Sequence, residues 1–417
     1  MFAGRIRHYG QLSQGFSNRK AGLLVESIDS LESVKANSAE WNLQGRFSKI
    51  VAEGGHAELR IRHYSAISTQ VTVLLQQAGY VGIVAAGAWM VIENQMTMGA
   101  LIACSIISGR ALAPVAQLPS IIVQLGNARA AGDGLDQLLR LPSELDDQDT
   151  MLTPEKLDAS LTLERVRFRY GLAGPTGQAA IEVNGLQIHP GERVGIIGTV
   201  GSGKSTLLKL AAGLYRPAEG RVLLGGVEMG LIDPKLVRAQ IAYLPQEIRL
   251  LSGSLRENLI IGLPDPGDEA ILNAARRTGL IELITRHSRG LALPITEGGR
   301  GISGGQRQLI GLTRVILAHP SIYILDEPTS SMDAGTEMRI VHLLNELAAG
   351  GATLIIATHK SALLPILEHV LVVQNGQVTI DGPRDRVLAH LAGQPPQSHQ
   401  GGAAVPTRRS EETPHGG

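Results

Sequence analysis

The sequence predicts a chain in two parts, an all-α segment that enters a membrane followed by an α/β domain. Three observations support this division. Long stretches between residues 64 and 128 are almost free of charge. Short apolar runs typical of buried parallel strands recur after residue 161, and the 50 glycines suit an α/β domain with many backbone-built loops. A chain of 417 residues is also too long for one ordinary domain.

The composition excludes several classes of protein. The 38 basic and 38 acidic side chains balance, so no field of the whole chain favours nucleic acid, and we expect no nucleic-acid partner. Cys104 is the single cysteine, which excludes an internal disulfide and a cysteine-based metal site. Residues 1–42 lack the apolar core of a secretory signal.

The first 62 residues are predicted to be polar and helical. Leu24, Ile28, Leu31 and Val34 recur at helical spacing and make this segment amphipathic, although an ordinary surface helix would show the same pattern.

Two membrane helices are expected next, at about 64–92 and 96–128. The first stretch has no charged residue and exceeds the ~20 residues needed to cross a bilayer. Basic residues flank the pair but are absent from the turn at Glu93, so both outer ends should lie in the cytosol. The alternative is a buried helical hairpin in a soluble protein.

Arg110 interrupts the second stretch, as do Pro114 and Pro119. An arginine facing lipid is costly, so it either faces a protein interior or an aqueous path, or sits at a proline-broken helix end without a role in transport.

Residues 143–160 are acidic and contain proline, as a linker does, and residues 393–417 are polar and predicted to be disordered. No internal repeat is present, which excludes a chain with two copies of one domain.

The α/β domain is organised around a glycine-rich loop between the apolar run 194–197 and a helix-like segment at 207–212. Glycines let successive N–H groups turn inward, and the following helix adds the positive end of its dipole, so the loop is predicted to hold a polyphosphate. Lys204 would reach the β- and γ-phosphates and Ser205 would bind Mg²⁺. A plain Gly/Ser turn is the alternative. The loop consists of Gly198, Thr199, Val200, Gly201, Ser202, Gly203, Lys204, Ser205 and Thr206.

Asp326 and Glu327 follow the apolar run 321–325, which is expected to be a buried parallel strand ending at the edge where the glycine-rich loop opens. We expect Asp326 to hold Mg²⁺ through water, and Glu327 to orient or deprotonate the attacking water. An acidic pair at a strand end is common by itself, and its pairing with the loop makes it informative.

A second run of small residues begins a helix at 302–306, where Ser303, Gly304, Gly305 and Gln306 offer free N–H groups to an anion. We call residues 302–306 the signature segment. Two such sites in one domain suggest a head-to-tail dimer, in which each Ser303 closes over the nucleotide held by Lys204 of the other copy.

These motifs together resemble the ATP-binding cassette (ABC) family, in that family's order and approximate spacing over residues 160–392. The resemblance implies an active ATPase of the α/β P-loop NTPase class, spanning 161–392 and using ATP and Mg²⁺. Ile302 stands where leucine is usual, which should preserve packing.

The resemblance implies functional roles for four more residues of this chain. Gln246 matches the glutamine that contacts Mg²⁺ and couples the nucleotide to the membrane domain, and His359 matches the histidine that contacts the γ-phosphate. Asp333 matches the loop that crosses between subunits. Tyr170 is similar to the aromatic residue that stacks on adenine, although a core tyrosine would look alike.

The preceding region resembles the end of an exporter's membrane domain. Residues 21–36 are similar to the second cytoplasmic coupling segment, and the two spans to the last two helices of a six-helix unit. Residues 1–142 then form a partial transmembrane domain. The chain is expected to be a fragment, to have a misplaced start, or to be completed by another polypeptide.

Within exporters, residues 297–301 and 326–333 look most like type I secretion transporters. This implies export of protein or peptide from a multi-pass subunit in the bacterial inner membrane, with the ATPase domain in the cytosol. The implied partners are a second ABC subunit, identical or full-length, a periplasmic adaptor and an outer-membrane channel. A lipid or drug exporter, a soluble cassette protein and a non-transporting remnant are the alternatives.

Overall fold

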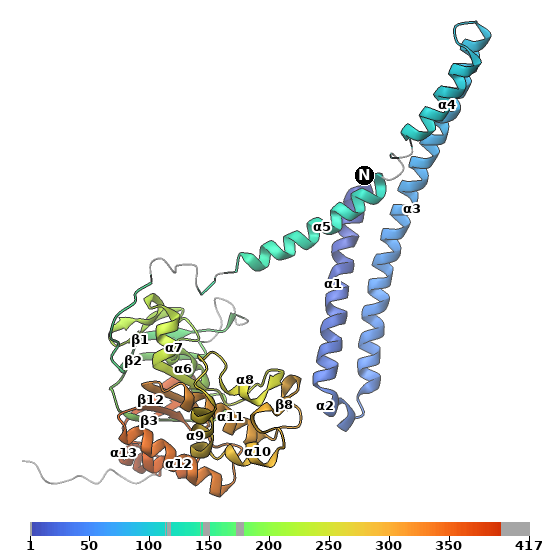
Figure 1. Ribbon diagram of the computed structural model, residues 1–417. Helices are drawn as coiled ribbons and strands as arrows, with labels where there is room; N and C mark the ends of the chain where they lie inside the picture. Colours follow the sequence, from blue (N-terminus) through green and yellow to red (C-terminus); the bar gives the residue numbers. More distant parts are fainter. Residues whose placement is uncertain are drawn as a thin grey trace, which may run out of the picture. The chain divides into compact units, whose positions relative to one another are not determined.

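The computed structural model describes residues 2–112, 114, 118–141, 143–144, 151–171 and 179–392. The chain divides into two compact units, Met1–Ser143 and Glu144–Gly417, and each is described by itself (Figure 1).

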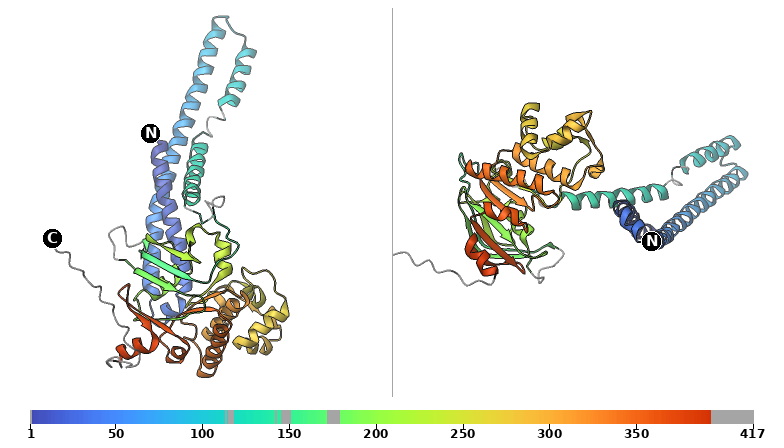
Figure 2. Two further views of the ribbon diagram at one scale, coloured as in Figure 1. Left: turned by 90° about the vertical axis from the view of Figure 1, so that its left-hand side faces the viewer. Right: turned by 90° about the horizontal axis from the view of Figure 1, so that it is seen from below.

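The first unit is helical. The long helices α1 and α3 run side by side and are joined through the short α2, as both Figure 1 and Figure 2 show. They pack closely where a Cβ added at Gly54 would lie 3.2 Å from the Cβ of Phe16, and the rings of Tyr9 and Tyr64 stack at 6.0 Å. The helices are α1 (Phe2–Asp29), α2 (Leu31–Ala36), α3 (Glu40–Ile92), α4 (Met98–Leu112) and α5 (Leu118–Leu139).

Helix α3 contains the first predicted membrane span. It is 53 residues long, and its second half includes the uncharged stretch 64–92. By length and apolar composition it is the one helix among the described residues that could cross a membrane. Predicted coupling segment 21–36 covers the end of α1 and all of α2.

The second predicted span, 96–128, is not a single helix in the structure. It is divided between α4 and α5, because proline removes a backbone donor and its ring clashes with the preceding turn, and Pro114 and Pro119 fall at the division. Helix α4 has 15 residues, so at about 1.5 Å per residue it is shorter than the ~30 Å hydrocarbon core. A multi-pass arrangement is therefore not confirmed.

The second unit contains a large mixed sheet whose strand order, in its described part, is β5-β4-β1-β2-β12-β11-β3-β10-β9-β6. Strands β11, β3, β10, β9 and β6 are parallel to one another, whereas β5, β4, β1 and β2 form an antiparallel set. Strand β12 joins the two sets, because it is parallel to β2 and antiparallel to β11. Strands β7 and β8 pair separately. The strands are β1 (Leu161–Phe168), β2 (Ile181–Ile188), β3 (Arg193–Ile197), β4 (Glu219–Leu224), β5 (Val227–Glu228), β6 (Ile241–Leu244), β7 (Gly253–Ser254), β8 (Pro294–Ile295), β9 (Ile322–Asp326), β10 (Thr353–Ala357), β11 (His369–Gln374) and β12 (Gln377–Pro383).

The helices of this unit cover the parallel strands. Alternate residues of each strand face opposite cores: Tyr243 packs with the cluster that includes α6, and Leu244 with the cluster that includes α11. The helices are α6 (Lys204–Ala211), α7 (Pro234–Gln240), α8 (Leu255–Leu259), α9 (Asp268–Thr278), α10 (Ile281–Arg286), α11 (Gly304–Leu317), α12 (Ala334–Ala349) and α13 (Arg384–Leu391), with 3₁₀ turns η4 (Met229–Leu231), η5 (Gly290–Ala292), η6 (Glu297–Gly299) and η7 (Ser361–Ile366).

Part of the predicted linker 143–160 is packed onto this unit. Leu152 forms a β-bridge with Ile232, and its N–H donates to the Leu231 carbonyl at 2.7 Å. The Ala159 carbonyl accepts from the Thr353 hydroxyl at 3.2 Å. Residues 145–150 and the predicted disordered tail 393–417 lie outside the described residues.

Replacing Thr353 with valine should destabilise the second unit. Thr353 is fully buried, and its hydroxyl also accepts from the Gly191 N–H at 2.9 Å, so valine leaves two partly buried polar groups without this partner. The expected cost is about 1–3 kcal/mol, or about 2–4 °C in Tm for each kcal/mol in a domain of this size.

Thermal unfolding of the purified chain measures this shift. Thr285 is the matched control, because its exposed hydroxyl bonds only carbonyls of its own helix. A Thr285→Val variant that lost as much Tm as Thr353→Val would contradict the explanation.

Candidate active site

Four parallel strands end at one edge of the sheet, and each is followed by a predicted site residue. In the register of the sheet Ala357 pairs with both Asp326 and Ile196, and Leu244 pairs with Leu325. The glycine-rich loop therefore follows β3, Glu327 follows β9, His359 follows β10 and Gln246 follows β6 at the same edge. Carboxyl ends of parallel strands are where ligands bind in such sheets.

The glycine-rich loop has a backbone that other residues would disturb. Gly201 and Gly203 have φ angles of +79° and +109°, in the region that glycine adopts without strain. A Cβ at Gly198 would collide with the Val373 carbonyl and lie 2.8 Å from the hydroxyl of Ser202. The loop can thus adopt this backbone only because these positions have no side chain.

Lys204 opens helix α6 directly after the loop. Its ammonium donates to the carbonyls of Gly198 at 2.8 Å and Thr199 at 2.9 Å, so the charge lies over the loop. The hydroxyl of Ser202 is buried without a hydrogen-bond partner among the described residues. A buried unpaired hydroxyl costs free energy, which a phosphate oxygen in the loop would recover.

Asp326 is a carboxylate held in an apolar strand, with 2% of its surface exposed. Burial raises the pKa of Asp326, the neighbouring Glu327 charge raises it further, and hydrogen bonding with the Ser205 hydroxyl opposes the shift. A buried carboxylate beside a hydroxyl forms a donor set that Mg²⁺ accepts, with phosphates and water completing its shell.

Glu327 is the meeting point of three predicted residues. Its carboxylate accepts from the Gln246 amide at 3.3 Å, and its other oxygen lies 3.2 Å from Nδ1 of His359. The φ angle of Glu327 is +49°, an uncommon conformation for a side-chain-bearing residue and one that clusters at functional sites. The structure therefore brings Gln246, Glu327 and His359 together.

Tyr170 lies beside helix α6. Its hydroxyl is 2.9 Å from that of Thr206, and its ring meets those of Phe168 and Tyr215 edge-on at 5.1 and 5.8 Å. Its 41% exposure leaves part of the ring free, as stacking on a base would require.

Ser303 and Asp333 both begin helices. Ser303 and Gln306 form a reciprocal capping box at the start of α11, at 3.0 and 3.2 Å. Gly304 and Gly305 follow it in the first turn. Asp333 caps α12 by accepting from the N–H and hydroxyl of Thr336 at 3.0 and 2.8 Å.

Two residues at the site were not predicted from the sequence. Gln308 is buried and donates to the Glu327 carbonyl at 3.2 Å, which fixes the turn after β9. Tyr243 places a buried hydroxyl, without a hydrogen-bond partner among the described residues, on the side of the sheet that faces α6. Gln308 lies two residues beyond the signature segment, and a polar residue on the inner face of that helix was the available signal.

Comparisons with known proteins point to one family. Residues 182–330 match the family model described as ABC transporter. The chain is 31% identical over 383 residues to the toxin RTX-I translocation ATP-binding protein of Actinobacillus pleuropneumoniae, covering 92% of this chain and 53% of that protein. It is 31% identical over 377 residues to leukotoxin translocation ATP-binding protein LktB of Mannheimia haemolytica, covering 90% and 52%.

The chain thus spans about half the length of the curated relatives it matches. A solved structure of a bacterial Atm1-family ABC exporter with ATP bound is similar in fold, with a TM-score of 0.82 over 93% of this chain and 69% of that chain, at 20% identity. This likeness confirms the predicted fold, a P-loop α/β domain preceded by helices.

Replacing Asp326 with asparagine should raise the Tm of the chain in magnesium-free buffer at pH 7. The raised pKa means that the folded state binds more protons than the unfolded state above the ordinary value of 3.8, so the free energy of unfolding falls as pH rises through this window. Asparagine removes that loss, so Tm should rise. The gain should shrink as the pH is lowered toward 4.

Asp333→Asn supplies a control of opposite sign. Hydrogen bonds from Thr336 lower the pKa of Asp333, so its ionised form favours the folded state, and the substitution should lower Tm. Equal and same-signed shifts for the two variants would contradict this account of Asp326.

Proposed function

Because this chain belongs to the ABC transporter family, we propose that residues 161–392 hydrolyse ATP and that the chain is the ATPase-bearing subunit of an exporter. One observation carries the proposal: Gln246, Glu327 and His359 converge at the strand edge where the glycine-rich loop and Lys204 also lie. A phosphate in the loop would have its terminal group facing this cluster.

Each residue has a role that its surroundings support. Lys204, freed from the loop carbonyls, neutralises charge that develops on the transferring phosphoryl group, and the loop N–H groups bind the remaining oxygens. Glu327 accepts the proton of the attacking water, and His359 donates to the γ-phosphate. Ser205, Asp326 and Gln246 would hold Mg²⁺, which would supply positive charge to stabilise the phosphate.

The proposed working unit holds two copies of the ATPase domain. The capping box already uses the N–H groups of Ser303 and Gln306, so Gly304 and Gly305 would supply the N–H groups of the signature segment. Asp333 opens α12 six residues after Glu327. In a head-to-tail dimer, Ser303 would close over the nucleotide of the partner copy, as the sequence motifs predict. The second copy is either identical or a full-length relative.

The comparisons favour protein or peptide as the exported cargo. The two relatives above are named as toxin and leukotoxin translocation ATP-binding proteins. Their matches cover 92% and 90% of this chain. Segment 21–36 would pass the opening and closing of the dimer to the membrane helices. We propose a multi-pass subunit of a bacterial inner membrane, with a periplasmic adaptor and an outer-membrane channel as further partners.

Replacing Glu327 with glutamine should retain ATP binding and ATP-driven dimerisation while lowering turnover by about 10²–10⁴-fold, the usual contribution of a general base. Phosphate release and size measured with ATP test this. Glu346→Gln, an exposed glutamate on α12, serves as the control and should keep full turnover. Retained hydrolysis in Glu327→Gln would remove Glu327 from this role.

Replacing Lys204 with alanine should weaken nucleotide binding itself by about 10–100-fold, because charge-assisted hydrogen bonds contribute about 1.5–3 kcal/mol. Titration with a fluorescent ATP analogue measures the Kd. Lys235→Ala, on the exposed start of α7, should bind as the unaltered chain does. If both variants bind equally well, the loop is not the nucleotide site.

A further inference from the structure

Arg314, on helix α11, is a partly buried cation whose described hydrogen-bond acceptors are all neutral. Its guanidinium donates to the carbonyl of Asn258, to the side-chain oxygen of Asn258 at 3.0 Å, and to the carbonyl of Arg249 at 3.3 Å. Burial lowers the pKa of Arg314, and no described carboxylate offsets that effect. An arginine placed at such a cost, and bonded only to main chain and amide, holds a backbone in position.

Asn258, which Arg314 contacts twice, holds the same stretch of backbone. It is 2% exposed. Its side chain accepts from the N–H of Leu251 at 2.9 Å and donates to the carbonyls of Leu251 at 2.8 Å and Ser254 at 3.1 Å. Arg314 and Asn258 therefore fix the far end of the loop that begins at Gln246.

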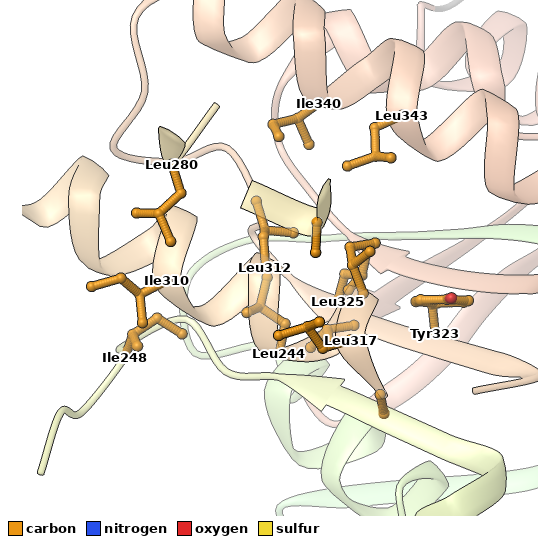
Figure 3. Packing of buried hydrophobic residues seen from close by; sticks show 14 of the residues in the cluster. Leu244, Ile248, Leu280, Ile310, Leu312, Leu317, Tyr323, Leu325, Ile340 and Leu343 are labelled. Carbon is orange, nitrogen blue, oxygen red and sulfur yellow. The ribbon is translucent and has the colours of Figure 1, made fainter. Parts of the chain in front are cut away.

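Helix α11 also approaches this loop closely. A Cβ at Gly311 would lie 2.6 Å from Cδ1 of Ile248 and 2.8 Å from Cδ1 of Leu244, so any larger residue there would push these two side chains aside. Ile248 is buried and lies next to Ile310 (Figure 3). The loop thus rests on the helix one turn before Arg314.

Apolar packing alone does not hold the loop. An open pocket of about 330 Å³ lies beside it, lined by Glu247 and Arg249 from the loop, by the preceding Pro245, and by Gly311 and Arg314 from α11. Space on this scale lets a loop shift, so the hydrogen bonds of Arg314 supply the constraint that packing leaves out.

We propose that Arg314 is a positioning residue that keeps the loop 246–251 in register with helix α11, so that Gln246 stays against Glu327. The helix that carries the signature segment at its start would then also set the position of the metal-binding glutamine. This inference rests on the roles proposed above for Gln246 and Glu327. It adds a fixed link between Gln246, which would serve the nucleotide of its own copy, and the signature segment, which would serve the nucleotide of the partner copy.

Hydrogen exchange of the purified full chain tests the positioning without requiring turnover. In Arg314→Gln, which keeps a donor but loses the charge and the fork, the peptide 246–252 should exchange at least about tenfold faster at Leu251, since the hydrogen bond from the Leu251 amide to Asn258 opens more often. Residues 198–206 should exchange as before. Unchanged exchange at 246–252, or equal acceleration in both segments, would overturn the proposal.

Arg286→Gln is the matched control, because Arg286 is an exposed arginine whose described ion pair is with Glu282 in its own helix. It should leave both segments unchanged. Arg314→Lys keeps the positive charge but has one donor nitrogen in place of the three nitrogens of the guanidinium. It should give an intermediate exchange rate, and it provides a second variant if Arg314→Gln unfolds.

The Mg²⁺ dependence of ATP hydrolysis gives a readout that a merely structural role would not move. Arg314→Gln should raise the Mg²⁺ concentration for half-maximal rate by about tenfold and lower kcat, because small misplacements of catalytic groups are costly. Nucleotide Kd without Mg²⁺ should stay within about twofold, since the loop at 198–206 is untouched. Unchanged Mg²⁺ dependence would overturn the proposal. If the unaltered chain itself fails to hydrolyse ATP, the proposed function fails, and the exchange result still decides the positioning.

Discussion

The parallel register of β3, β10, β9 and β6 is the constraint on which the rest of the site depends. All five residues of β9 and all five of β10 are buried, so neither strand can slip by one residue without turning apolar side chains to the wrong core. Glu327 lies 81 positions from Gln246 and 32 positions from His359 in the sequence, and the three meet only because those strands end together. The site is thus a consequence of sheet pairing more than of any local motif.

Two buried charges show different uses of the same physical cost. Asp326 is desolvated at the end of β9, and its hydrogen-bond partner is the neutral hydroxyl of Ser205. A cation bound there would therefore supply the positive charge that the buried carboxylate needs. Arg314 is desolvated inside α11, and carbonyls of Asn258 and Arg249 already satisfy its donors. The first charge prepares a ligand site, whereas the second charge has its partners within the chain and holds backbone in place.

Local patterns explain why much of this was predictable. The glycine-rich loop, the strand ending at Asp326 and the capped start of α11 each depend on residues adjacent in sequence, and the structure has them where the sequence analysis expects them. The positive φ of Glu327 and the contact of Gln308 with its carbonyl had no such local signal. Arg314 and Asn258 are 56 positions apart, so their hydrogen bonds depend on tertiary packing that no single stretch of sequence encodes.

The helical unit shows the limit of reading hydropathy without backbone geometry. A window of uncharged residues indicates only how readily a segment enters lipid. The prolines at 114 and 119 instead interrupt hydrogen bonding within a helix, and this interruption explains where α4 ends. Arg110 consequently lies in the last turn of α4, where a cation faces the negative end of the helix dipole. Of the two explanations for this arginine, the helix end therefore has direct geometric support, and a charge there needs no transport pathway to account for it.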